Sequence, residues 1–134
     1  MRVIVIGGTG TIGSAVVKRL STRHEVVVVG HKKGTFQVDL ASPDSITSLF
    51  KAIGTCDAVV STAGIAKFAS LDDLTYDDYF IGLKNKLMGQ ANLVRIGRPF
   101  VTNHGSFTLT SGVLSQHPMK GSASISMVNA GLEG

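Results

Sequence analysis

A glycine-rich segment near the amino terminus has residue types and spacing that fit a specific chemical task. It reads Gly7-Gly8-Thr9-Gly10-Thr11-Ile12-Gly13, and Gly8, Gly10 and Gly13 match the pattern G-x-G-x-x-G. Glycines allow a tight turn and a close approach of the backbone to a pyrophosphate, whose oxygens the free amides of a following helix can bind. We expect a dinucleotide-binding turn rather than a purely structural one, with contacts from Gly7, Thr9, Gly10, Thr11, Ile12 and Gly13.

A basic segment after the next β-branched run bears on which dinucleotide binds. An NAD site often has an Asp or Glu here, which accepts a hydrogen bond from the ribose 2′-hydroxyl. This chain instead has His31, Lys32 and Lys33 after Gly30. Positive charge suits a 2′-phosphate, so the sequence favours NADP over NAD, with His31 and Lys32 as contacts. The alternative is that these side chains form a solvated loop.

Alternating strand and helix patterns must position these residues. The β-branched and apolar runs predict strands over Arg2–Ile6, Glu25–Val29, Thr35–Val38, Ala58–Val60 and Phe107–Leu109. Apolar spacings of three and four predict helices over residues 12–20, 43–53 and 75–96, and the small residues of 121–134 are weakly helical. Because no hairpin signal separates the strands, we predict an α/β fold: a Rossmann-type doubly wound parallel sheet with helices on both faces.

Composition sets broad limits on the class of protein. The length of 134 residues suits one dinucleotide-binding domain over 1–134 with a single core. Hydrophobic residues make up 43% and charged residues 16%, which argues against a disordered chain and a coiled coil. One cysteine, Cys56, cannot form an intramolecular disulfide, and no Cys/His cluster has metal-binding spacing. We therefore expect no metal and a cytoplasmic location.

Charge and hydropathy bear on the partners. The 13 basic and 9 acidic residues give a net charge of +4, but the positive charges are scattered, so we expect no nucleic-acid binding. No apolar run approaches the ~20 residues of a membrane helix, and Met1–Ile6 leads directly into glycines rather than into a signal-peptide core. The expected partner is a small-molecule substrate, with a homo-oligomer left open.

The motifs together resemble the short-chain dehydrogenase/reductase family over essentially the whole chain. Gly7, Gly10 and Gly13 are similar to its cofactor turn, in the G-x-x-G-x-x-G spacing of its extended and atypical members. Asp39-Leu40 resembles the pair beside the adenine, and Ser61-Thr62-Ala63-Gly64 resembles the family's Asn-Asn-Ala-Gly turn after the fourth strand. This resemblance adds four expected cofactor contacts: Asp39, Leu40, Ala63 and Gly64.

The resemblance also identifies catalytic positions, two of which carry unexpected residues. Ser111 matches the catalytic serine after the fifth strand. Aligning residues 131–134 with the family's Ala-Leu-Glu-Gly places Ile125 at the tyrosine position and Asn129 at the lysine position. In the family, the tyrosine protonates the carbonyl as hydride arrives, and the lysine lowers the tyrosine's pKa and holds the nicotinamide ribose. Neither Ile125 nor Asn129 can perform these roles.

Other residues are candidates for the missing roles. Lys86 falls where the family's fourth helix usually has an asparagine, and it could support the ribose or a catalytic water. His117 and Lys120 lie on the loop after Ser111 and could supply the acid, although such loop residues are usually only solvated. Ser111 and Lys86 are therefore the predicted catalytic residues.

Two functions follow from the resemblance. The favoured one is an NADP-dependent oxidoreductase of the short-chain dehydrogenase/reductase type, acting on a small carbonyl or alcohol substrate. The alternative is a catalytically silent NADP-binding regulator or partner subunit. Family subunits continue past the catalytic helix with two further strands, so we expect the C-terminal strands of the sheet to be missing from this sequence.

Overall fold

A parallel β-sheet forms the centre of the protein in a computed structural model that describes all residues, 1–134. The strand order is β3-β2-β1-β4-β5, and every neighbouring pair is parallel. The strands are β1 (Arg2–Ile6), β2 (Glu25–Gly30), β3 (Phe36–Gln37), β4 (Cys56–Ser61) and β5 (Val101–Thr108). The order runs outward from β1 in both directions, which confirms the predicted Rossmann-type doubly wound sheet.

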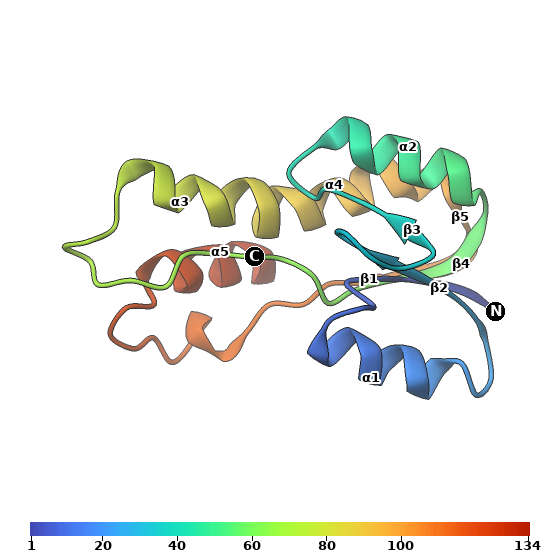
Figure 1. The fold of residues 1–134 in the computed structure, drawn as a ribbon, viewed down its shortest axis with the longest axis horizontal. Coiled ribbons are helices and arrows are strands. Elements are labelled where there is room, and N and C mark those ends of the chain that lie inside the picture. Colours follow the sequence, from blue (N-terminus) through green and yellow to red (C-terminus); the bar gives the residue numbers. More distant parts are fainter.

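Helices cover both faces of the sheet (Figure 1). Helix α1 packs on one face, while α2 and α4 pack together on the other. Helices α3 and α5 lie side by side beyond the carboxyl ends of the strands. The helical segments are α1 (Thr11–Leu20), α2 (Pro43–Ile53), α3 (Tyr76–Gly82), the π-helix η1 (Leu83–Leu87), α4 (Met88–Gly97), the 3₁₀ helices η2 (Arg98–Phe100) and η3 (Val113–Ser115), and α5 (Ala123–Glu133).

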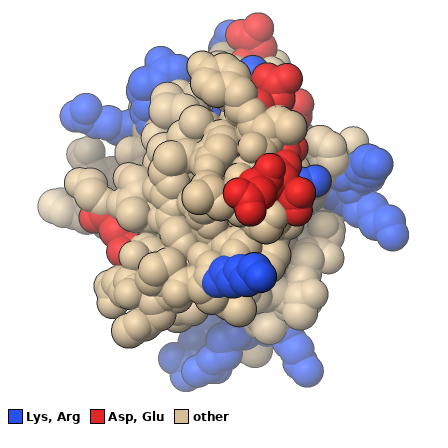
Figure 2. All heavy atoms as spheres, turned by 90° about the vertical axis from the view of Figure 1, so that its left-hand side faces the viewer, with Lys and Arg blue, Asp and Glu red and all other residues tan.

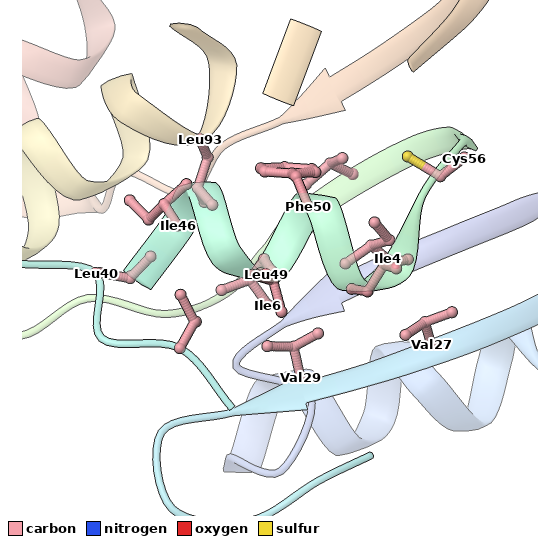
Figure 3. Packing of buried hydrophobic residues seen from close by; sticks show 13 residues of the cluster. Ile4, Ile6, Val27, Val29, Leu40, Ile46, Leu49, Phe50, Cys56 and Leu93 are labelled. Carbon is pink, nitrogen blue, oxygen red and sulfur yellow. The ribbon is translucent and has the colours of Figure 1, made fainter. Parts of the chain in front are cut away.

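The main hydrophobic core lies between the sheet and the α2–α4 layer (Figure 3). Phe50 of α2 and Leu93 of α4 are fully buried there against Ile4 and Ile6 of β1. Full burial of such a side chain stabilises the folded state by about 1.5–3 kcal/mol. A smaller cluster, formed by Val3, Val5 and Ala58, lies on the α1 face of the sheet. Both clusters hold β1 rigidly, and β1 leads directly into the glycine turn.

Local capping explains where two helices begin and end. The Ser42 side chain accepts a hydrogen bond from the Ser45 amide, Pro43 occupies the first turn of α2, and Gly54 ends the helix with φ +77°. Thr75 and Asp78 form a capping box at the start of α3. The hydrogen bond from the Thr75 amide lowers the pKa of Asp78. These signals are local, so both helices start where the sequence predicts.

Several predicted boundaries differ from the structure. β3 is shorter than Thr35–Val38 because only Phe36 and Gln37 pair with β2, while β4 is longer than Ala58–Val60. β5 begins at Val101 rather than Phe107 and does not include Leu109. Its register against β4 shifts between Cys56↔Val101 and Ala58↔Ser106, so a polar bulge containing His104 (φ +67°) interrupts the strand.

The helical predictions need two corrections. The predicted helix 75–96 reaches Gly97 but contains the π-helix η1 in its middle. The weakly helical segment 121–134 forms a regular helix, α5, from Ala123 to Glu133. Packing of α5 against α3 and η1 supplies the stabilisation that its small residues do not provide by propensity.

Charged side chains are unevenly distributed at the end of the molecule that contains α3 and α5 (Figure 2). Acidic side chains gather along one side of this end, and most of the Lys and Arg side chains project from its periphery. The basic groups are therefore not joined into a continuous patch on this face. None of the helices in the structure is both long enough and apolar enough to cross a membrane.

Candidate functional site

A cavity of 320 Å³ lies at the carboxyl ends of β1, β2 and β4. The direction of the strand order changes between β1 and β4, and ligands of open α/β sheets bind in the crevice outside such a point. The cavity also receives residues from the segment after β3 and from η1. Its lining residues are Ile6, Gly7, Thr9, Gly10, Gly30, His31, Val38, Leu40, Thr62, Ala63, Gly64, Ile65 and Asn85.

The glycine turn between β1 and α1 forms one wall of the cavity. Gly7 has φ +80°, a conformation that favours glycine, and its carbonyl oxygen accepts a hydrogen bond of 2.9 Å from the Gly10 amide. A Cβ atom on Gly13 would overlap the Gly7 carbonyl group. Gly8 instead packs against β2, where a Cβ would lie 3.0 Å from Val28 Cγ1. The turn thus follows the spacing Gly7, Gly10, Gly13.

The amino end of α1 is open to an anion. Its N-cap, Gly10, provides no side-chain acceptor, and no acidic residue lies in the first turn. The amides of Thr11, Ile12 and Gly13 have no acceptor within the helix, because the first such bond runs from the Ser14 amide to the Gly10 carbonyl. These amides and the positive end of the helix dipole therefore favour a phosphate here. The Ile12 side chain itself is 62% exposed on the outer face of α1.

The end of β2 forms the opposite wall. His31 lines the cavity, and its Nδ1 lies 3.3 Å from the Val38 carbonyl oxygen. Lys32 is exposed and outside the cavity lining. Leu40 is buried and lines the cavity, whereas Asp39 faces an adjacent hollow and accepts a hydrogen bond from the Ala41 amide. Of these predicted contacts, His31 and Leu40 thus reach the cavity directly.

The segment after β4 completes the cavity. The Thr62 amide and hydroxyl both donate hydrogen bonds to the Ile6 carbonyl, which joins the ends of β4 and β1. Ala63 and Gly64 line the cavity as predicted. The Ile65 amide donates to Asn85 Oδ1 at 2.8 Å. Asn85 was not predicted, because its role depends on a contact with the Ile65 amide, which lies 20 residues away in the sequence.

Ser111 and Lys86 meet beside this cavity, at the exit of β5. Lys86 Nζ donates a hydrogen bond of 3.3 Å to the Ser111 carbonyl oxygen, and burial lowers the pKa of Lys86. The Ser111 hydroxyl lies within hydrogen-bonding distance of Glu133 Oε1 (2.5 Å) and the Asn129 carbonyl oxygen (3.2 Å). Hydrogen bonds from Ser111 and Ser115 lower the pKa of Glu133. The structure thus brings the two predicted catalytic residues together, with the Ser111 hydroxyl directed toward α5.

The two positions that lack the family's tyrosine and lysine lie on α5. Asn129 is 2% exposed, and its Oδ1 has no hydrogen-bond partner. A Cβ on Gly112 would lie 2.8 Å from Asn129 Nδ2, so this amide faces the segment after β5. Ile125 is half-buried one helical turn earlier. His117 and Lys120 are exposed on the loop before α5, outside the cavity lining.

The potential for metal binding is limited. No group of three or more His, Cys, Asp or Glu side chains lies close enough together to hold a metal ion. The polar groups at the site are backbone amides, hydroxyl groups, the Lys86 ammonium, the Glu133 carboxylate and the imidazole of His31.

Comparison with known proteins identifies the family. Residues 3–116 match the model of the NAD dependent epimerase/dehydratase family. The chain belongs to this family. No curated protein matches this epimerase/dehydratase family member.

Solved structures give close matches to this epimerase/dehydratase family member. The protein lin1944 from Listeria innocua is 39% identical with a TM-score of 0.97, covering 98% of this chain and 66% of that chain. A small-chain dehydrogenase in complex with NADPH is 28% identical with a TM-score of 0.90, covering 99% of this chain and 60% of that one. Serine dehydrogenase from Escherichia coli, at 19% identity, has the same fold with a TM-score of 0.85, covering 97% of this chain and 70% of that one.

These matches confirm the predicted membership of the short-chain dehydrogenases/reductases. The family member spans less than two thirds of the length of the NADPH-bound chain.

Proposed function

We propose that this protein is an NADP-dependent oxidoreductase that acts on a small carbonyl or alcohol substrate. The observation that carries the proposal is the glycine turn, where Gly7 and Gly13 allow a tight backbone turn beside the uncapped end of α1 and Gly10 leaves open space in front of it that a side chain would fill. A related protein, 28% identical, binds NADPH. The residues present therefore fit a nicotinamide dinucleotide.

Each part of the site has a proposed role in holding the cofactor. The amides of Thr11, Ile12 and Gly13 bind the pyrophosphate. His31 and Lys32 lie beside the adenosine ribose, where positive charge stabilises a 2′-phosphate. The contacts proposed to complete the binding site are Thr9, Asp39, Leu40, Ala63 and Gly64.

The bound cofactor supplies hydride transfer to or from the carbonyl carbon. Ser111 orients the substrate oxygen, which requires its hydroxyl to turn from Glu133 toward the substrate. The Lys86 ammonium donates a hydrogen bond to the backbone carbonyl of Ser111 and so holds the segment after β5 in place. No step of this scheme uses Ile125 or Asn129, since neither side chain exchanges protons near neutral pH. The proton that the substrate oxygen takes up or releases is exchanged with another acid, for which His117 and Lys120 are the candidates.

A second candidate function is a catalytically silent NADP-binding regulator or partner subunit. The observation that favours it is the chemistry of α5, where Ile125 and the buried Asn129 provide no proton donor of matched pKa. The two functions share cofactor binding and differ in turnover.

Ligand titration with one variant tests the shared claim. Gly10→Val should retain the fold, because a Cβ there meets only the Gly7 carbonyl at 3.3 Å, while its methyl groups obstruct the approach of a pyrophosphate. We expect calorimetry to detect NADPH binding to the parent and not to Gly10→Val. Ala15→Val, on the exposed face of α1, is the matched control and should bind like the parent.

Two outcomes decide between the functions. Equal NADPH affinity for Gly10→Val and the parent would mean that the turn is only structural. NADPH consumption by the parent on a panel of aldehydes and ketones would exclude the silent regulator, whereas tight binding without turnover would favour it.

A further inference from the structure

Lys86 is a partly buried cation without a matching anion. Its ammonium group has three N–H donors, of which one hydrogen bond, to the Ser111 carbonyl, is formed. The salt bridge in the structure joins Arg2 to Glu25, so no carboxylate lies within 4.0 Å of Lys86 Nζ. Burial of an ammonium is unfavourable unless polar partners compensate for it. The unused donors therefore mark a place where an acceptor from a ligand would be stabilised.

The stem of Lys86 forms part of the wall between the cavity and β5. A Cβ on Gly64, which lines the cavity, would lie 2.7 Å from Lys86 Cγ. The preceding residue, Asn85, lines the cavity and binds the Ile65 amide. The side chains of Asn85 and Lys86 are thus neighbours in the sequence, and they contact the exits of β4 and β5, respectively.

The π-helix contributes to this placement. The Met88 amide bonds to the Leu83 carbonyl, an i to i+5 bond that widens the helix at Asn85 and Lys86. Such bulges occur frequently at functional sites. One turn later, Gln90 is fully buried and binds the backbone of Thr110. The helix and the β5 exit are therefore held together at Thr110 as well as at the Lys86 contact.

The strand order shows which part of a dinucleotide would lie near Lys86. A pyrophosphate at the amino end of α1 lies beyond β1, with β2 on one side and β4 and β5 on the other. His31 and Lys32, at the end of β2, lie on the adenosine side. The second nucleoside must then extend across the exits of β4 and β5, where Lys86 contacts Ser111.

Ser111 also receives a contact from the opposite direction. Its hydroxyl lies 3.2 Å from the backbone carbonyl oxygen of Asn129 on α5, the position that lacks a lysine. The Lys86 ammonium on η1 and the backbone of Asn129 on α5 therefore contact the same residue. The positive charge at this strand exit therefore comes from Lys86 on η1 and not from residue 129 on α5.

We propose that Lys86 binds the ribose hydroxyls of the nicotinamide half of the bound dinucleotide, from η1 and in place of a cation on α5. This inference rests on the proposed function, because it requires a dinucleotide in the cavity. Lys86 contacts only one half of the ligand, so its removal should affect only ligands that contain that half.

Two ligands distinguish binding of the nicotinamide half of the dinucleotide from binding of the adenosine half. NADPH contains both nucleosides, whereas adenosine 2′,5′-bisphosphate has the 2′-phosphate and lacks the nicotinamide riboside. Calorimetric titration should show that Lys86→Met lowers the affinity for NADPH about ten- to hundredfold, which is the effect expected from losing a hydrogen bond to a charged group. Binding of adenosine 2′,5′-bisphosphate should change by less than about twofold, within the scatter of such measurements. Lys51→Met, an exposed lysine in the last turn of α2, should leave both ligands unchanged.

A second variant guards against a folding defect. Lys86→Gln is uncharged and polar, and it should lose NADPH affinity selectively in the same way. Equal losses for both ligands, or no loss for either, would overturn the proposal for Lys86 while leaving the proposed function intact. Failure of the parent protein to bind either ligand would overturn the proposed function and this proposal together.

Discussion

Gln90 and Thr110 form two hydrogen bonds with each other. Gln90 Nε2 donates to the Thr110 carbonyl at 2.9 Å, and the Thr110 amide donates to Gln90 Oε1 at 3.0 Å. The side-chain amide of a fully buried glutamine thus pairs with the backbone as a neighbouring strand would. Thr110 Oγ1 also donates to the Ser61 carbonyl, so the exit of β5 is tied to both α4 and β4.

Replacing Gln90 should therefore destabilise the protein. Gln90→Met has a similar volume but leaves the amide and carbonyl of Thr110 without partners. An unsatisfied buried group costs about 1–3 kcal/mol, and Thr110 is half-buried, so we expect a total loss of about 1–3 kcal/mol in the free energy of unfolding. Urea denaturation followed by circular dichroism measures it. Gln37→Met, on the exposed edge strand β3, is the control and should change stability by less than about 0.5 kcal/mol.

The basic segment after β2 gives a prediction about cofactor choice. The double variant Lys32→Ala with Lys33→Ala should lower the affinity for NADPH about tenfold or more and the affinity for NADH only slightly, because only NADPH carries a 2′-phosphate. The difference should shrink in high salt, since both lysines are exposed. Lys18→Ala with Lys51→Ala removes the same charge elsewhere and should affect both cofactors equally. Equal losses of NADPH and NADH in the Lys32/Lys33 variant would contradict this role.

The sequence contains most of the fold because its signals are local. Ser42, Pro43 and Gly54 set the limits of α2 by capping and backbone geometry, and the structure has those limits. The limits of β5 depend on a partner strand, because its exposed polar residues have no apolar alternation. The π-helix η1 lies where Asn85 and Lys86 form hydrogen bonds to the exits of β4 and β5. Such non-local contacts leave no pattern in the chain itself.

The same difference between local signals and non-local contacts decides which parts of the candidate site could be predicted. The glycine turn was predictable because Gly7, Gly10 and Gly13 meet a backbone requirement at fixed spacing. Asn85 was missed because its role depends on the distant Ile65 amide. The direction of the Ser111 hydroxyl was equally beyond the sequence, since Glu133 reaches it only when α5 packs beside the β5 exit.

The contact between Ser111 and Glu133 predicts a pH dependence. Hydrogen bonds hold the pKa of Glu133 below its ordinary value of 4.5, so the ionised form contributes stability that is complete above that value. This contribution is lost as the pH falls through the lowered pKa. Glu133→Gln should be less stable than the parent at pH ~7, and the difference should shrink below pH ~4.5.

Thermal unfolding of both proteins across this pH range measures the difference. Asp57 and Asp78 also have lowered pKa values and destabilise both proteins alike in acid, so the comparison isolates Glu133. A difference that stays constant from pH ~7 to pH ~3 would show that the carboxylate charge is not involved.

The last prediction concerns the proton donor that α5 lacks. Ile125 and Asn129 are four residues apart on one helix, so they share a face, and Asn129 and Lys86 both contact Ser111. If Lys86 supplies the cation, a phenol at residue 125 is the only group still missing. Ile125→Tyr should therefore raise the rate of NADPH oxidation on a panel of aldehydes and ketones. The gain should approach the roughly 10²- to 10⁴-fold that general acid catalysis contributes.

Adding Asn129→Lys should give no further gain, because a second ammonium would enter a buried position near the first. A much faster double variant would mean that Lys86 does not provide this charge. A parent already as fast as Ile125→Tyr would mean that another acid acts, and His117 and Lys120 would be the first residues to replace.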